Sequence, residues 1–95
     1  MLEHILARIR GKIRRRQYVV TLHAKREMDE DDLTIYDVEH VILTGEILER
    51  QRDFESIEVK YRIQGRTIAD FAAEVIAKIS PTGKVVVITV YLSED

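Results

Sequence analysis

The chain has no cysteine and only one proline among its 95 residues. The absence of cysteine excludes disulfides, thiolate zinc sites and cysteine nucleophiles, and it fits a reducing compartment, so we expect a cytoplasmic protein. Glycine-rich phosphate loops and serine nucleophile motifs are also missing, which disfavours nucleotide-dependent enzymes and hydrolases of those types. Because the sequence has no repeat and no low-complexity tract, residues 1–95 are expected to form one domain with one core.

Long hydrophobic runs are absent as well. The apolar residues of the N-terminal segment are interrupted by Glu3, His4, Arg8 and Arg10. Such a segment is neither a signal-peptide core nor a membrane span, which needs roughly 20 apolar residues. We therefore expect a chain that stays in water.

Charge is distributed unevenly along the chain. Residues 1–26 hold eight Lys and Arg against Glu3 alone, a net charge of +7, and since the whole chain carries −2, the remainder carries −9. This asymmetry indicates either a basic surface that meets a polyanion or an acidic face that meets a basic partner. It is also what a basic helix neutralised by the chain's own acidic residues would show.

The N-terminal segment from Leu2 to Arg16 has the spacing of an amphipathic helix. Its apolar stripe consists of Leu2, Ile5, Leu6, Ile9 and Ile13. Arg14 to Arg16 are expected to form its exposed C-terminal turn, where cations suit the helix dipole. This basic helix, residues 1–16, is the first part of the domain, followed by motif and helices at 18–45 and an antiparallel sheet at 46–92.

A second, short helix is predicted after an extended piece, Tyr18–Val20. Thr21 can act as its N-cap, because a threonine hydroxyl accepts a hydrogen bond from a backbone N–H two or three residues later. Within this helix His23 and Glu27 are four residues apart and share a face. The acidic run Asp29–Asp32 ends it.

A third helix is predicted from a capping signal. Thr34 with Asp37 three residues later resembles a capping box, and Gly45 supplies the C-terminal stop. The apolar stripe of this helix consists of Ile35, Val38, Val41 and Ile42. His40 lies opposite that stripe, so we expect it in solvent.

The period of the pattern changes to two after Gly45. Residues 46–53 are a weak strand candidate, and residues 57–64 are a strong one. Ile57, Val59, Tyr61 and Ile63 share the apolar face of the second, so Tyr61 is expected in the core. Residues 85–92 also alternate, but both of their faces are largely apolar, which predicts a central strand covered on both sides.

Residues 67–80 fit two structures. A helical apolar stripe and several alanines favour a helix, whereas the turn signature at Ser80–Gly83, directly before a strand, favours a hairpin over residues 70–92. We predict a strand here. The expected fold is then α+β, with the N-terminal helices packed on a small antiparallel sheet of three to four strands.

Three pieces of the chain together resemble a small family of domains of unknown function. The pieces are Val19–Met28 (V-V-T-L-H-A-K-R-E-M), Thr34–Glu39 with Leu43–Glu46, and a closing strand at Val87–Tyr91. Members of that family read T-x-H-A-x-x-R-M, then a helix that opens with D-V and closes with G-E, then a similar strand. The resemblance covers most of the chain after Gln17.

The resemblance implies a fold and a function. The family is thought to be similar to the RelE and BrnT toxins, in which helices pack on a small antiparallel sheet, and some of those toxins cleave RNA. They are neutralised by an antitoxin encoded beside them, in this family often a small zinc-finger or DNA-binding protein. The resemblance therefore implies a toxin-like endoribonuclease that acts on mRNA, free or on the ribosome, without a cofactor. It also leaves a homodimer open.

Metal-free RNA cleavage needs one group to deprotonate the 2′-OH, one to protonate the 5′-leaving oxygen, and charge stabilisation of the phosphorane. His23 is the best candidate for proton transfer, because a position near a helix N-terminus disfavours the imidazolium and Glu27 can orient the ring. Alternatively, His23 is a helix-start residue that bonds to the backbone. Tyr91 could position or protonate a substrate oxygen, and Arg26 completes the predicted catalytic set.

The other cations of the motif and the sheet are candidates for binding phosphate, namely Lys25, Lys60, Arg62 and Arg66. An arginine guanidinium presents paired donors that match two phosphate oxygens. The alternative for the strand residues is a solvated strand face. No metal site is expected, because no metal-ligand spacing relates the three histidines, His4, His23 and His40.

A non-catalytic protein-interaction domain of the same fold is the second hypothesis. It is motivated by the acidic run after Met28, where members of the family commonly carry arginine, and by the charge of −9 outside residues 1–26. This hypothesis predicts a stable complex with a partner and no RNA affinity. The endoribonuclease hypothesis predicts salt-sensitive binding to RNA.

Overall fold

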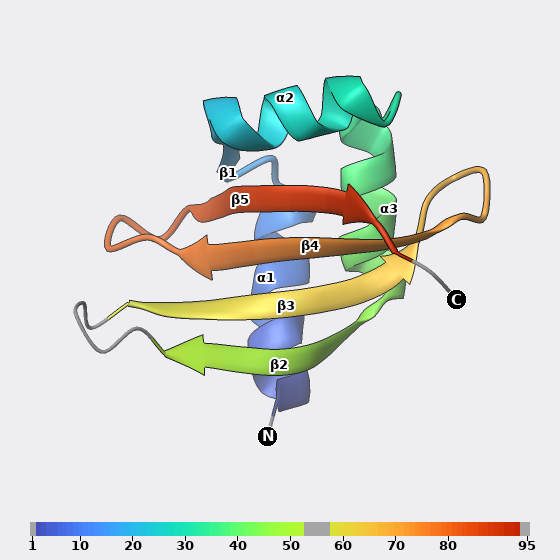
Figure 1. Cartoon of the computed structure of the whole chain (residues 1–95). Coiled ribbons are helices and arrows are strands. Elements are labelled where there is room, and N and C mark those ends of the chain that lie inside the picture. The colour runs from blue at the N-terminus through green and yellow to red at the C-terminus, as the bar shows by residue number, and fades with distance from the viewer. Residues whose placement is uncertain (1, 53–57, 94–95) are drawn as a thin grey trace.

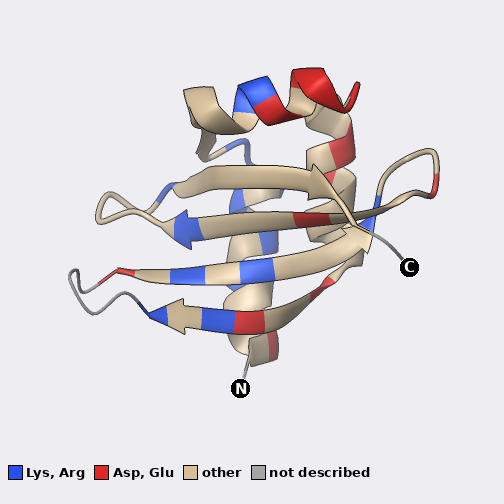
Figure 2. Ribbon diagram, in the orientation of Figure 1, with Lys and Arg blue, Asp and Glu red and all other residues tan. Residues whose placement is uncertain are grey.

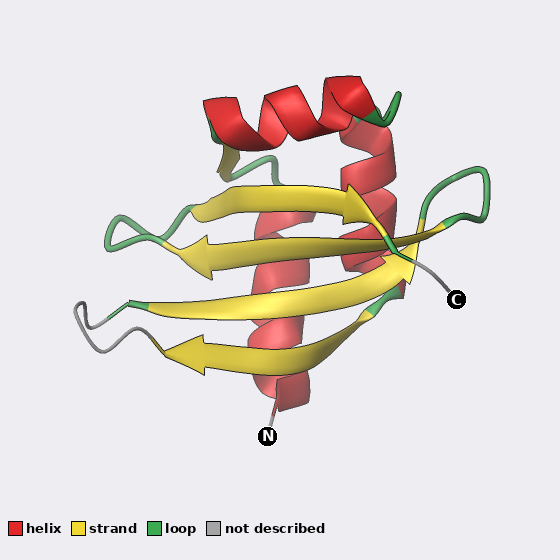
Figure 3. Ribbon diagram, viewed as in Figure 1, coloured by secondary structure: helices red, strands yellow, loops and turns green. Residues whose placement is uncertain are grey.

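The computed structural model of the chain describes residues 2–52 and 58–93, and within them it has three helices and five strands (Figures 1 and 3). In chain order the elements are α1 (Leu2–Arg14), β1 (Tyr18–Val20), α2 (Leu22–Glu30), α3 (Ile35–Thr44), β2 (Glu46–Arg52), β3 (Val59–Arg66), β4 (Ala72–Ile79) and β5 (Val85–Leu92). The predicted α+β class is confirmed. Asp53 and Ile57, which the patterns assigned to strands, lie outside the described residues.

The strands form one sheet in the order β1-β5-β4-β3-β2. Strands β2 to β5 pair antiparallel with their neighbours, whereas β1 pairs parallel with β5, so that Tyr18 faces Val85 and Val20 faces Val87. The predicted antiparallel pairing is confirmed for β2 to β5, but the sheet has five strands instead of three to four, and the added strand β1 makes it mixed. A three-residue strand shows no clear period of two, and its partner lies far along the chain, so no local pattern reveals this pairing.

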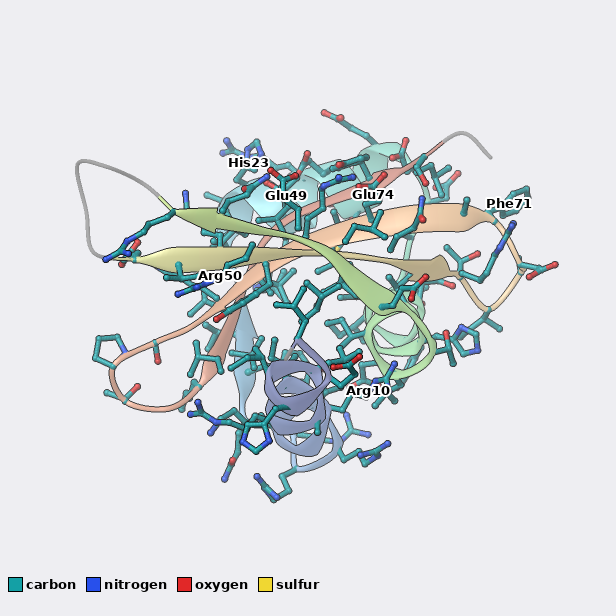
Figure 4. All side chains as sticks on the ribbon, turned by 90° about the horizontal axis from the view of Figure 1, so that it is seen from below. Arg10, His23, Glu49, Arg50, Phe71 and Glu74 are labelled. Carbon is teal, nitrogen blue, oxygen red and sulfur yellow. The ribbon has the colours of Figure 1, made fainter. Side chains whose placement is uncertain are left out.

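Helices α1 and α3 pack on one face of the sheet, and within the described residues no helix covers the other face (Figures 1 and 4). Ile9 and Ile13 of α1 and Val41 of α3 are almost fully buried in the core between these layers. Tyr61 also belongs to that core, as its place on an apolar strand face predicted. Helix α2 runs along the edge of the sheet beside β5 (Figure 1).

The second and third helices start at the predicted caps. The Thr21 hydroxyl accepts a hydrogen bond from the Ala24 N–H at 3.1 Å, and α2 begins at the next residue. The Thr34 N–H donates to Asp37 Oδ2 at 2.9 Å, and the Asp37 N–H donates back to Thr34 Oγ1 at 3.3 Å. Both predictions are confirmed. Caps can be predicted from sequence because their partners are only three residues apart.

Helix α1 is shorter than predicted and is tied to α3 by Arg10, a half-buried residue of its basic face. It ends at Arg14, and Arg16 has a positive φ of 57° that does not continue a helix. The Arg10 guanidinium reaches from α1 to the end of α3 (Figure 4), where Nε donates to the Ile42 carbonyl at 3.0 Å and Nη2 donates to the Gly45 carbonyl. One cation of the basic helix thus satisfies carbonyls that the end of a helix leaves without partners.

Residues 72–79 form strand β4, which confirms the strand prediction for residues 67–80 and shows that the helix alternative was wrong. The turn signature before β5 correctly predicted a hairpin, and Gly83 in that turn adopts a φ of 90°, which favours glycine. Residues 67–71 are a loop instead of the first part of the strand.

Strand β5 contains an irregularity that alternation alone does not predict. Ile76 pairs with Thr89 and Ala77 pairs with Val87, so Ile88 has no opposite residue and forms a bulge. The bulge keeps Val87 and Val90 both in the core although they are three residues apart. The prediction of a central strand is confirmed, since β5 lies between β1 and β4, but the face that carries Val86 and Tyr91 is only half-buried.

His40 does not lie free in solvent as predicted. Its ring is half-buried, and Nδ1 lies 2.7 Å from the Arg66 carbonyl oxygen at the end of β3. A carbonyl only accepts, so Nδ1 donates. The helix periodicity could not show that a strand end comes alongside this face of α3.

Candidate functional site

The uncovered face of the sheet carries a connected group of polar side chains, which we call the strand-face network: Glu49, Arg62, Glu74 and Tyr91. Arg62 Nη1 donates to Glu74 Oε1 at 2.6 Å, and Arg62 Nε donates to Glu49 Oε2 at 3.0 Å. The Tyr91 hydroxyl donates to the same Glu74 oxygen at 3.1 Å. The network therefore spans β2, β3, β4 and β5.

Glu74 is the centre of this network and is only 7% exposed. An ionised carboxylate at a buried position needs charged or hydrogen-bonding partners, and Arg62 and Tyr91 provide them. Burial raises the pKa of Tyr91, and the hydrogen bond and negative charge of Glu74 raise it further. The hydrogen bonds to Glu74 and then to Glu49 raise the pKa of Arg62. Tyr91 thus keeps its proton, and two carboxylates face one guanidinium.

A second polar pair lies where α2 meets β5. His23 Nε2 is 3.3 Å from Glu27 Oε1, and the same Glu27 oxygen accepts a hydrogen bond from the Val90 N–H at 3.1 Å. Because a carboxylate only accepts, the contact places the ring proton on Nε2 and leaves Nδ1 as the basic atom of the neutral ring. The His23 side chain is 68% exposed, so most of the ring is open to solvent.

Acidic residues of α2 and of its C-terminal cap have a structural role at this edge. Strand β1 covers only the first part of the β5 edge, and beyond it Glu27 accepts from the Val90 N–H while Asp31 Oδ2 lies 3.5 Å from the Leu92 nitrogen. Carboxylates one helical turn apart thus satisfy N–H groups that a strand edge leaves unpaired. Part of the acidic run after Met28 serves the fold.

His23 and Tyr91 connect to consecutive positions of β5. Val90, which bonds to the His23–Glu27 pair, is followed directly by Tyr91 of the strand-face network. In Figure 4, His23, Glu49 and Glu74 all lie on the side of the sheet opposite α1.

The cations predicted to bind phosphate do not form one cluster. Lys25 and Arg26 are exposed on α2, while Lys60 and Arg66 lie near opposite ends of β3, about 20 Å apart at the rise of a strand. Arg66 Nη1 donates to the Asp70 carbonyl at 3.2 Å. Arg62 lies between them, within the strand-face network.

Two members of the network, Glu49 and Glu74, were not predicted as site residues. The available signal was Glu74 itself, the one acidic residue of β4, which lies among apolar residues. No comparable signal marks Glu49, because β2 is charged along its length.

Residues 20–92 match a protein family described as a domain of unknown function, DUF4258. The chain belongs to this family. No curated protein and no solved structure matches the chain. The DUF4258 region contains the strand-face network and the His23–Glu27 pair. Helix α1 precedes this region, but its residues Ile9 and Ile13 are part of the hydrophobic core.

The described part of this DUF4258 chain contains no group of three His, Asp or Glu side chains placed to hold a metal ion. Nor does any helix among the described residues combine the length and the apolar character needed to cross a membrane. The strand-face network and the adjoining His23–Glu27 pair present an imidazole, a phenol, carboxylates and a guanidinium.

Proposed function

We propose that the chain is the toxin-like component of a toxin–antitoxin pair, an endoribonuclease that uses acid–base chemistry without a metal at the uncovered face of its sheet. The observation that carries the proposal is the arrangement around β5. His23 and Glu27 meet this strand at Val90, and the next residue, Tyr91, joins Glu74 on the uncovered face. An exposed imidazole and a protonated hydroxyl, connected to consecutive residues of β5, are the kinds of group that RNA cleavage needs.

Each residue has a role in this proposal. His23 Nδ1 takes the proton of the 2′-OH, with Glu27 holding the ring through Nε2. Tyr91 turns its hydroxyl from Glu74 to the 5′-leaving oxygen and donates its proton there, which the raised pKa keeps on the hydroxyl until that step. Arg26, three residues after His23 on the same side of α2, stabilises charge on the phosphorane.

The basic end of the sheet supports binding of the RNA backbone. Figure 2 shows Lys and Arg at the end of β2, β3 and β4 that lies away from the acidic end of α2. Lys60 and Lys78 belong to this end, and Lys78 Nζ donates to Glu58 at 2.8 Å. Arg62 holds Glu74 and Tyr91 in place in this scheme, because two carboxylates already occupy its guanidinium.

The test is cleavage of labelled single-stranded RNA by the purified chain in the presence of EDTA. We expect new RNA ends with the wild-type protein, none with His23→Ala, and unchanged cleavage with His4→Ala, an exposed histidine on α1 that precedes the family region. In a host without an antitoxin, induction of the wild type should arrest growth and His23→Ala should not. Wild-type protein that neither cuts RNA nor arrests growth would refute the proposal.

The proposal implies two kinds of partner. One is mRNA, free or on the ribosome, and the other is an antitoxin, a small zinc-finger or DNA-binding protein. Salt dependence separates this function from a non-catalytic interaction domain. Binding to RNA at physiological ionic strength that weakens as salt rises counts against the interaction domain. The observation that favours the interaction domain is a group of exposed apolar side chains at the acidic end of the molecule.

A further inference from the structure

The loop between β3 and β4 holds two large apolar side chains outward. Ile68 is 62% exposed and Phe71 is 61% exposed. The loop is fixed by its own hydrogen bonds, since the Thr67 N–H donates to the Phe71 carbonyl at 2.8 Å and the Phe71 N–H donates to Thr67 Oγ1 at 3.0 Å. Thr67 itself is 2% exposed. The two apolar side chains are therefore presented by an ordered loop.

Residues from two other parts of the chain lie beside this loop. Asp37 Oδ1, at the start of α3, accepts a hydrogen bond from the Ile68 N–H at 3.0 Å, and the preceding residue, Tyr36, is 58% exposed. The Ser93 N–H donates to the Ala72 carbonyl at 2.9 Å, directly after Phe71. The loop, the start of α3 and the end of β5 thus form one end of the molecule, with Phe71 at its tip (Figure 4).

This end is acidic. It carries six carboxylates and one guanidinium, that of Arg66. Figure 2 shows acidic positions from the end of α2 to the β3–β4 loop. The carboxylates are those of Asp29, Glu30, Asp31, Asp32, Asp37 and Asp70. We call this surface, with Tyr36, Ile68 and Phe71, the acidic apolar end. Its net charge of −5 repels polyanions such as RNA.

We infer that the acidic apolar end binds a basic amphipathic segment of another protein, with apolar side chains against Ile68 and Phe71 and with Lys or Arg against the surrounding carboxylates. Contiguous exposed apolar side chains rimmed by polar residues mark interaction sites, and charge complementarity selects the partner. This inference does not depend on RNA cleavage, because the surface lies at the end of the molecule away from the basic ends of β2 to β4.

The first test uses a synthetic amphipathic peptide made only of Leu and Lys as the probe, with a Leu and Glu peptide of the same pattern as its control. Fluorescence anisotropy should show binding of the basic peptide alone. The double variant Ile68→Ser with Phe71→Ser should weaken binding by roughly tenfold or more. The matched control is Val19→Ser with Leu22→Ser, which removes exposed apolar side chains of 45% and 64% exposure elsewhere and should leave the Kd unchanged.

The second test removes charge without disturbing the backbone. Asp32 and Asp70 have positive φ values of 54° and 70°, a conformation that asparagine adopts readily. Asp32→Asn with Asp70→Asn should weaken binding at low salt, and the difference should vanish at high salt. The inference would be overturned if the two apolar double variants lost the same affinity for the peptide. It would also be overturned if the asparagine variant bound the peptide as tightly as the wild type, or if RNA displaced the peptide. RNA cleavage by the same variants is measured separately, so failure of one idea is distinguishable from failure of the other.

Discussion

Replacement of Gly65 by alanine should destabilise the fold strongly. A Cβ atom at this position would lie 2.6 Å from the Val41 carbonyl oxygen and 3.0 Å from the Cα of Gly45. Both are backbone atoms, so no side chain can turn away, and α3 would have to move off β3. Overpacking of this kind typically costs about 1–3 kcal/mol, and the rigid neighbours place the expected loss at about 3 kcal/mol.

The matched control is the same substitution at Gly11 in the interior of α1. The atoms near a Cβ there belong to the Arg15 side chain, the nearest at 3.5 Å, which is an ordinary contact. Alanine loses less backbone entropy than glycine in a helix, so Gly11→Ala should stabilise the chain by about 1 kcal/mol. The two substitutions add the same atom and should shift the free energy of unfolding in opposite directions.

Urea unfolding followed by far-UV circular dichroism measures both free energies, and thermal unfolding gives a second reading. In a domain of this size, 1 kcal/mol corresponds to a shift of roughly 4–8 °C in Tm. A loss below about 1 kcal/mol for Gly65→Ala would refute the reasoning. Destabilisation of similar size by Gly65→Ala and Gly11→Ala would also refute it, because the loss could then not be assigned to the close approach of α3 to β3.

Three further predictions concern polar groups. Glu74→Gln should lower the free energy of unfolding in urea several-fold more than Glu49→Gln, since both contact one arginine but only Glu74 is buried; equal losses would contradict this. Burial, and then the hydrogen bond to the Glu39 carboxylate, raise the pKa of Tyr18 to about 12. The stability that this contributes is present below pH 10 and should be lost as the pH rises toward 12. Tyr18→Phe should make the free energy of unfolding fall less steeply over that range. Glu27→Ala should speed hydrogen exchange of the Val90 amide, and an unchanged rate would show that the carboxylate does not protect the strand edge.

Local signals predicted the parts of the fold whose partners are close in the chain. Both helix caps depend on residues three apart, and the turn at Ser80–Gly83 correctly favoured a strand over a helix for the preceding segment. Gly45 was predicted as a helix stop and does end α3, but its φ of −91° is accessible to any residue. Glycine is required there because a Cβ atom would lie within 3 Å of the Gln64 backbone, a contact between distant segments.

The sequence by itself determined the amphipathic helix, the caps, the hairpin of β4 and β5 and the polar residues available for chemistry, because each follows from spacing or composition over a short stretch of chain. Only the tertiary structure decided that β1 pairs parallel with β5, that Glu74 joins Arg62 to Tyr91, and that Glu27 links His23 to β5. These contacts join residues that are mostly distant in the chain, and they depend on which elements the packed core brings together.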